Sequence, residues 1–64
     1  MTLMELTILQ TWDELEESNP LKSTEWLMTM TADICSTQLR CRITTEHVAE
    51  ALMNESLEKE GKPS

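Results

Sequence analysis

The chain has 64 residues and a formal net charge of −7, because twelve acidic side chains outnumber five basic ones. This length allows one small domain that buries about 60% of its unfolded surface, and two cysteines are too few for the disulfide framework of a small secreted domain. The acidic charge argues against direct binding of nucleic acids or anionic membranes, since cationic side chains supply most of the affinity for phosphate.

The first residues do not predict a signal peptide. No basic segment precedes the apolar side chains of residues 1–12, and Glu5 interrupts them. No apolar stretch approaches the ~20 residues of a membrane-spanning helix, so we expect a cytoplasmic protein in a reducing compartment. The chain has two tryptophans and no phenylalanine or tyrosine. Its core is therefore small, and we expect a homodimer or an obligate complex to add stability.

A first helix is predicted over residues 3–18. Thr2 and Glu5 have the spacing of a capping box at its start. The residue before Pro20 is disfavoured in helical conformation, so the helix ends at Asn19. Apolar residues recur at spacings of three and four and predict one buried stripe, formed by Met4, Ile8, Leu9, Trp12 and Leu15.

A second helix is predicted over residues 24–38, with Ser23 or Thr24 as its N-cap. Two adjacent apolar rows predict that it is the most buried element: Leu27, Met30 and Ile34 in one, and Met28, Ala32, Cys35 and Leu39 in the other. Several threonines lower its helix propensity, because β-branched side chains lose rotamer freedom in a helix. We expect it to fray between Ser36 and Leu39.

Residues 39–43 alternate apolar and basic side chains, which predicts a short extended connector. The alternation predicts an inward orientation for Leu39, Cys41 and Ile43 and an outward orientation for Arg40 and Arg42.

A third helix is predicted over residues 45–59, with Thr44 as its cap and Glu46 in its first turn. Its apolar stripe comprises Val48, Ala49, Leu52, Met53 and Leu57. The predicted fold is therefore an all-α, three-helix domain over residues 1–57. Residues 58–64 contain the only glycine and the second proline, and we expect a frayed or disordered tail.

Four acidic residues occupy the last turns of the first predicted helix: Asp13, Glu14, Glu16 and Glu17. Each acid in the last turn faces the negative end of the helix dipole, at a cost on the order of 0.3–1 kcal/mol. Three interpretations are open. The acids form a solvated face, or Arg40 or Arg42 folds back onto them, or they bind a basic partner.

No motif for metal binding or catalysis emerges. Cys35, Cys41 and His47 are each six residues apart, which differs from the cysteine spacing of structural zinc sites. A disulfide between the two cysteines is geometrically possible but unfavoured in a reducing compartment, and both are expected to be small buried residues. Three short helices rarely enclose a substrate pocket of about 300 Å³. We expect no metal, no cofactor and no enzymatic activity.

Residues 32–52, ADICSTQLRCRITTEHVAEAL, resemble the end of the second helix, the basic loop and the third helix of a histone fold. The resemblance covers about a third of the chain. It implies a helix–connector–helix arrangement. The chain departs from the histone pattern at Asn19-Pro20, which interrupts the span where that fold has a long middle helix, and no function is carried over.

These observations favour a non-enzymatic acidic protein that binds a basic or helical surface of another protein, as an adaptor, inhibitor or small subunit. One version is a regulator whose carboxylates imitate a nucleic-acid backbone. The methionines after Met1 fit either a core or an adaptable groove for a partner helix. The candidate partner-binding residues are Trp12, Asp13, Glu14, Glu16, Glu17, Trp26, Arg40 and Arg42. The alternative is a helix–turn–helix or histone-like module that reaches DNA through a basic partner subunit.

Overall fold

The part of the chain that the structure describes forms three helices and no strand. They are α1 (Leu3–Ser18), α2 (Thr24–Leu39) and α3 (Thr45–Gly61). This computed structural model describes the backbone of residues 2–61 and the side chains of residues 2–57. The predicted all-α, three-helix fold is confirmed. Of the predicted tail, residues 58–61 continue the backbone of α3, and residues 62–64 lie outside the described residues.

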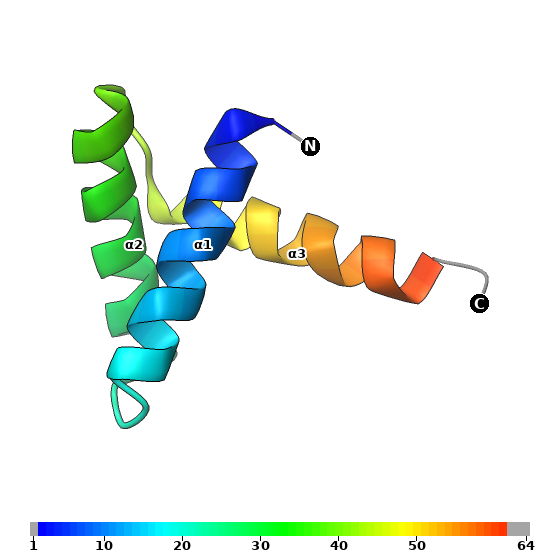
Figure 1. The fold of residues 1–64 in the computed structure, drawn as a ribbon, viewed down its shortest axis with the longest axis horizontal. Coiled ribbons are helices and arrows are strands. Elements are labelled where there is room, and N and C mark those ends of the chain that lie inside the picture. The colour runs from blue at the N-terminus through cyan, green and yellow to red at the C-terminus, as the bar shows by residue number, and fades with distance from the viewer. Residues whose placement is uncertain (1, 62–64) are drawn as a thin grey trace.

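The helices form a hairpin and a projecting arm. α1 and α2 lie side by side in opposite directions, and α3 crosses them near the middle and extends away from the hairpin (Figure 1). Seventeen helical residues span about 25 Å, so much of α3 lies beyond the hairpin. The molecule is consequently flat, with extents of 35 × 28 × 17 Å.

Side-chain caps explain where the first two helices begin and end. The hydroxyl of Thr2 accepts a hydrogen bond from the backbone N–H of Glu5 at 3.1 Å. At the other end of α1, the backbone N–H and the side-chain amide of Asn19 both donate to the carbonyl of Leu15. The cap of α2 is Ser23, whose hydroxyl accepts from a backbone N–H in the first turn. These bonds satisfy backbone groups that helix ends otherwise leave unpaired.

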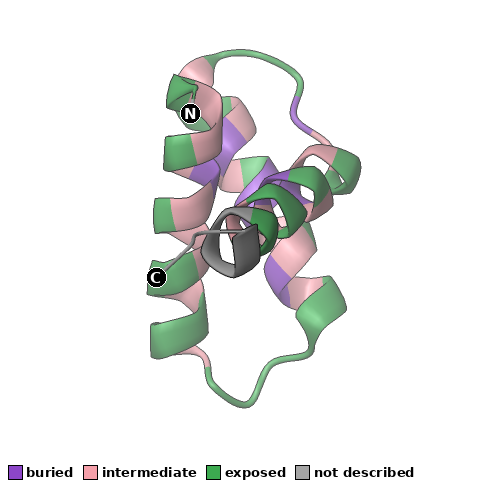
Figure 2. Cartoon of the chain, turned by 90° about the vertical axis from the view of Figure 1, so that its right-hand side faces the viewer, coloured by how far each residue is buried: buried purple, intermediate pink, exposed green. Residues whose placement is uncertain are grey.

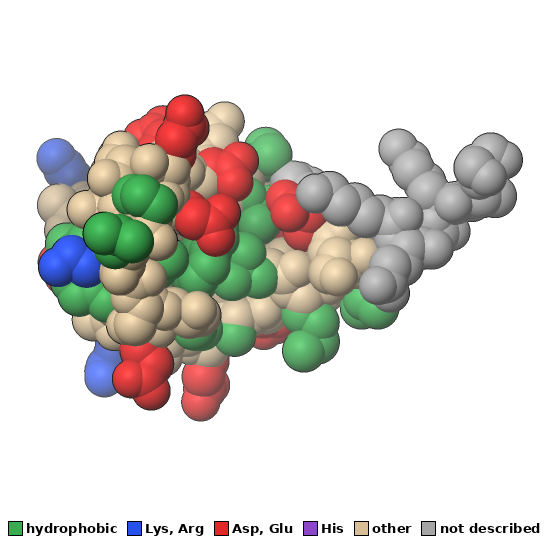
Figure 3. Space-filling model, turned by 90° about the horizontal axis from the view of Figure 1, so that it is seen from below, with side chains coloured by type: hydrophobic (Ala, Val, Ile, Leu, Met, Phe, Trp, Pro, Cys, Tyr) green, Lys and Arg blue, Asp and Glu red, His purple; other side chains and the backbone are tan. Residues whose placement is uncertain are grey.

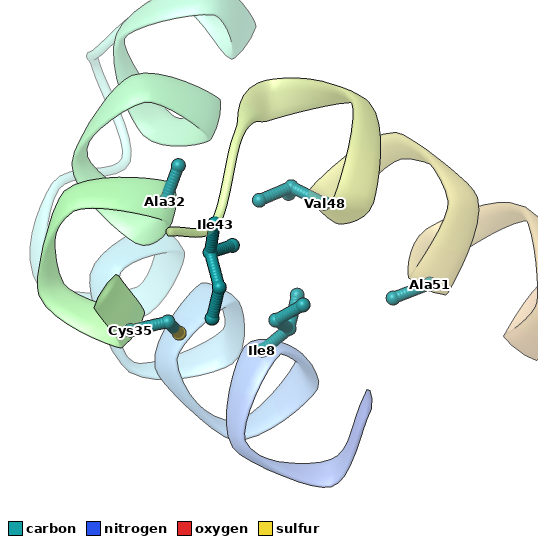
Figure 4. Packing of buried hydrophobic residues seen from close by; sticks show 6 residues of the cluster. All are labelled: Ile8, Ala32, Cys35, Ile43, Val48 and Ala51. Carbon is teal, nitrogen blue, oxygen red and sulfur yellow. The ribbon is translucent and has the colours of Figure 1, made fainter. Parts of the chain in front are cut away.

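The core is built mostly from small side chains at the point where the three helices meet (Figure 4). Its buried members are Ile8, Ala32, Cys35, Ile43, Val48 and Ala51. Ile43 comes from the connector and points between side chains of all three helices (Figure 4). Its predicted inward orientation is confirmed, with 5% of its surface exposed.

The predicted apolar stripe of α3 is wrong beyond its second turn. Met53 and Leu57 are 64% and 59% exposed, because they lie on the side of α3 that faces away from the buried Val48 and on the half of the helix that leaves the hairpin. On α2 the buried face also differs, since Thr31 is buried while Met30 is only half-buried. In the described part of the projecting arm, residues 52–57 are all exposed or half-buried (Figure 2).

Thr31 is the one fully buried polar side chain among the described residues, and its hydroxyl has no hydrogen-bond partner. A buried hydroxyl without a partner costs about 1–3 kcal/mol in lost hydration. The β-branched shape of Thr31 suits this position in the core, whereas its oxygen does not.

We therefore expect Thr31→Val to raise the free energy of unfolding by about 1 kcal/mol, because valine keeps the branched shape and removes the unpaired oxygen. Urea titration followed by circular dichroism measures the change. The matched control is Thr29→Val on the exposed face of α2, where we expect a change within about 0.5 kcal/mol. A loss of stability in Thr31→Val would show that the hydroxyl is bonded in the folded protein.

Candidate interaction surface

The four acids Asp13, Glu14, Glu16 and Glu17, named the acidic end from here on, are all exposed on the last turns of α1. The first turn of α2 lies beside these turns, because the hairpin is antiparallel (Figure 1). The positive end of the α2 dipole therefore offsets part of the unfavourable field at the end of α1. The sequence of α1 alone does not reveal this compensation, because it depends on the position of α2.

Arg40 and Arg42 lie beyond the other end of the hairpin, where α2 passes into the connector (Figure 1). Both are exposed, as predicted, and neither forms an ion pair with any side chain that the structure describes. The interpretation in which an arginine folds back onto the acidic end is therefore wrong for this structure. The two arginines and the acidic end therefore lie at opposite ends of the hairpin.

The connector begins with an unusual backbone conformation at Arg40. Its φ of 52° and ψ of 41° lie in the left-handed region, the only positive φ among the described non-glycine residues. The backbone N–H groups of Arg40 and Cys41 both donate to the carbonyl of Ser36. This is the capping pattern that glycine usually provides at a helix end. The structure shows α2 as regular helix through Leu39, over the residues where fraying was predicted.

Ser36 also fixes the rest of the connector. Its hydroxyl accepts from the backbone N–H of Ile43 at 2.9 Å, and it lies 2.7 Å from the carbonyl of Ala32, to which it donates. One side chain thus ties the last turns of α2 to the residue that enters the core. The sequence interpretation did not single out Ser36, because a serine in a helix carries no signal of its partner seven residues away.

The predicted inward orientation of Cys41 is wrong. Cys41 is exposed and Cys35 is fully buried, and both thiols are free. The left-handed residue at Arg40 turns the chain, so the strand-like alternation predicted from residues 39–43 does not hold at position 41. No group of histidine, cysteine, aspartate or glutamate among the described residues could hold a metal ion.

His47 has a structural role at the start of α3. Its Nδ1 accepts a hydrogen bond from the backbone N–H of Thr44 at 3.1 Å. His47, the third residue of α3, therefore caps Thr44, the residue before the helix, as glutamate does in a capping box. His47 also lines an open cleft of ≈ 290 Å³ between α1 and α3, together with Met4, Glu5, Glu50, Ala51 and Asn54.

The two tryptophans are half-buried and lie on neighbouring helices. Trp12 packs against the core, and Nζ of Lys22 lies 5.1 Å from the ring centroid of Trp26. Lys22 therefore makes a cation–π contact with Trp26, and no ion pair joins it to the acidic end in the described part of the chain. The hairpin brings Trp26 to the same end as the acids and leaves the arginines apart from them. A partner-binding role for either tryptophan stays a prediction.

No protein family, curated protein or solved structure matches this chain. Within the described residues, no helix combines the length and hydrophobicity needed to cross a membrane.

Replacing Arg40 with glycine should raise the free energy of unfolding by about 1 kcal/mol, because glycine adopts a left-handed conformation without a side-chain clash. Thermal and urea unfolding measure the effect. Arg42→Gly removes the same charge at a position without positive φ, and should leave stability unchanged or lower. Equal effects from the two substitutions would contradict a backbone origin.

Cys41 should react with a thiol reagent such as dithionitrobenzoate in the native protein, whereas Cys35 should react only after unfolding, because a fully buried thiol is inaccessible. Stopped-flow absorbance and mass spectrometry of Cys35→Ala and Cys41→Ser identify the reacting residue. Rapid modification of both cysteines in the native protein would contradict the placement of Cys35.

Proposed function

We propose that this chain is a non-enzymatic binding protein that uses its acidic end to contact a basic surface of another protein, as an adaptor, inhibitor or small subunit. The observation that carries the proposal is the exposed acidic end without an ion pair to any described side chain. The acids at one end of the hairpin are exposed and have no cationic partner among the described side chains, while both arginines lie at the other end.

Unpaired surface charge of one sign favours association with a complementary surface. Each charge pair at contact contributes about 1 kcal/mol in water, and a cluster of like charges also raises the association rate by attracting its partner over a distance. Both effects weaken with added salt, since the Debye length falls to about 8 Å at physiological ionic strength. The favourable position of the α2 dipole reduces the cost of the acids in the folded chain but leaves their charge available to a partner.

The charge of α3 argues against the alternative of a DNA-associated module. In a helix–turn–helix arrangement α3 would enter the groove, yet Glu46 and Glu50 are exposed on it and repel phosphate. Such a module would depend on a basic partner subunit for its affinity. A titration of duplex DNA at low salt with the chain alone separates the two functions, because only a DNA-binding chain gives a signal.

The test of the proposed function is the triple substitution Glu14→Lys, Glu16→Lys and Glu17→Lys. Affinity capture from the lysate of the encoding organism, followed by mass spectrometry, should yield a basic protein with the wild-type chain and lose it with the variant. The capture should weaken as salt increases. Because these residues are exposed, circular dichroism should show an unchanged fold.

A matched pair controls for net charge. Glu16→Lys and Asp33→Lys change the charge equally, but Asp33 lies on α2 away from the acidic end. Only Glu16→Lys should weaken capture. Equal retention by the wild-type chain and the triple variant, with the same salt dependence, would overturn the proposal.

A further inference from the structure

Residues 53–57 of α3 have no buried side chain. Among the described side chains of this helix, Val48 and Ala51 are buried, and Leu52 packs against the core. From Leu52 to Leu57 none of the described side chains is buried, although the helix continues to Gly61. Isolated helical segments of about ten residues are marginally stable in water. The outer half of α3 is therefore the part of the fold whose stability would increase most on contact with a partner.

Two large apolar side chains, Met53 and Leu57, are exposed on this half of α3. They are four residues apart and so share one face of the helix. By helical spacing, the same face carries the exposed Glu46 and Glu50 nearer the hairpin. We name these four residues the outer face of α3. Figure 3 shows hydrophobic side chains close to acidic ones where the arm leaves the hairpin.

The negative charge of α3 favours a different protein over a second copy of this chain as the partner. Residues 46–61 contain five glutamates and one lysine, a net charge of −4, so two copies of α3 packed together would repel each other. A helix with apolar residues at spacings of three and four, flanked by lysine or arginine, would instead complement both the apolar pair and the glutamates. This arrangement is the common mode by which an amphipathic helix docks on an apolar surface.

We propose that the outer face of α3 binds a basic amphipathic helix of a partner protein. This inference rests on the part of the proposed function that gives the chain a basic protein partner, and it names a second contact surface for that partner. Binding would extend the packing of α3 beyond the hairpin and protect its outer half. The acidic end attracts the partner through charge, and the outer face of α3 adds apolar contact that charge alone does not provide.

The probe is a synthetic amphipathic helix of leucine and lysine. Two controls are a peptide with glutamate in place of lysine and a scrambled peptide of the same composition that is not amphipathic. Calorimetry should show 1:1 binding of the leucine–lysine helix in the micromolar range, as expected for a small interface, and no binding of the controls. Hydrogen exchange should show new protection of backbone amides in residues 53–57.

The variant Met53→Gln with Leu57→Gln should weaken binding of the leucine–lysine helix by at least about tenfold. Both residues are outside the core, so circular dichroism should be unchanged. The matched control replaces two exposed leucines outside α3, Leu3→Gln with Leu21→Gln, and should leave binding unchanged. Equal binding by the wild-type chain and the Met53/Leu57 variant would overturn the inference, as would binding of the glutamate peptide.

The two proposals fail separately. If the triple lysine variant of the acidic end loses a captured partner that the Met53/Leu57 variant retains, the proposed function stands and the α3 surface fails. If the Met53/Leu57 variant loses a captured partner that the triple lysine variant retains, the acidic end fails as a contact and the α3 surface stands. Sedimentation of the wild-type chain adds one further outcome: a dimer that dissociates on substitution of Met53 and Leu57 would assign this face to a second copy and overturn the inference.

Discussion

The hydroxyl of Ser36 sets the direction in which the chain leaves α2, and the position of α3 depends on it. The hydroxyl accepts a hydrogen bond from the backbone N–H of Ile43. The backbone carbonyl of Ser36 accepts hydrogen bonds from the N–H groups of Arg40 and Cys41. These bonds hold Ile43 in the core, and α3 starts two residues later, at Thr45. α3 then crosses the hairpin near its middle (Figure 1). The outer face of α3 stays uncovered because it lies opposite the buried Val48 and Ala51.

The start of each helix and the end of α1 were predictable because they are determined locally. Thr2, Ser23 and Asn19-Pro20 act within a few residues of the helix ends that they define, so their effect is visible in the sequence. The path of the connector was not predictable in this way. Arg40 adopts a conformation that glycine or asparagine would have signalled, and the resulting turn exposes Cys41. The exposure of Met53 and Leu57 likewise depends on which side of α3 packs against the hairpin, which no local pattern specifies.

The electrostatics of the acidic end also depend on the packing of the helices and not on the sequence of α1 alone. The sequence identifies the acidic end as a run of charge, and the expected penalty follows from the dipole of α1 alone. The structure adds the first turn of α2, whose dipole has the opposite sign at the same place. It also separates Arg40 and Arg42 from the acids by the length of the hairpin. Which charges are paired is a property of the packed helices, so the choice between internal neutralisation and an exposed acidic surface required the fold.

The small core and the uncovered arm have related consequences. Alanine and cysteine fill three of the six positions in the buried cluster, so the chain gains less from burial than a core of larger side chains would provide. A partner that binds only the folded state adds stability through mass action, about 2.7 kcal/mol when its concentration is 100 times the dissociation constant. That amount is a large fraction of the stability of a small domain. If a partner helix binds the outer face of α3 as proposed, the same contact would supply both recognition and stability.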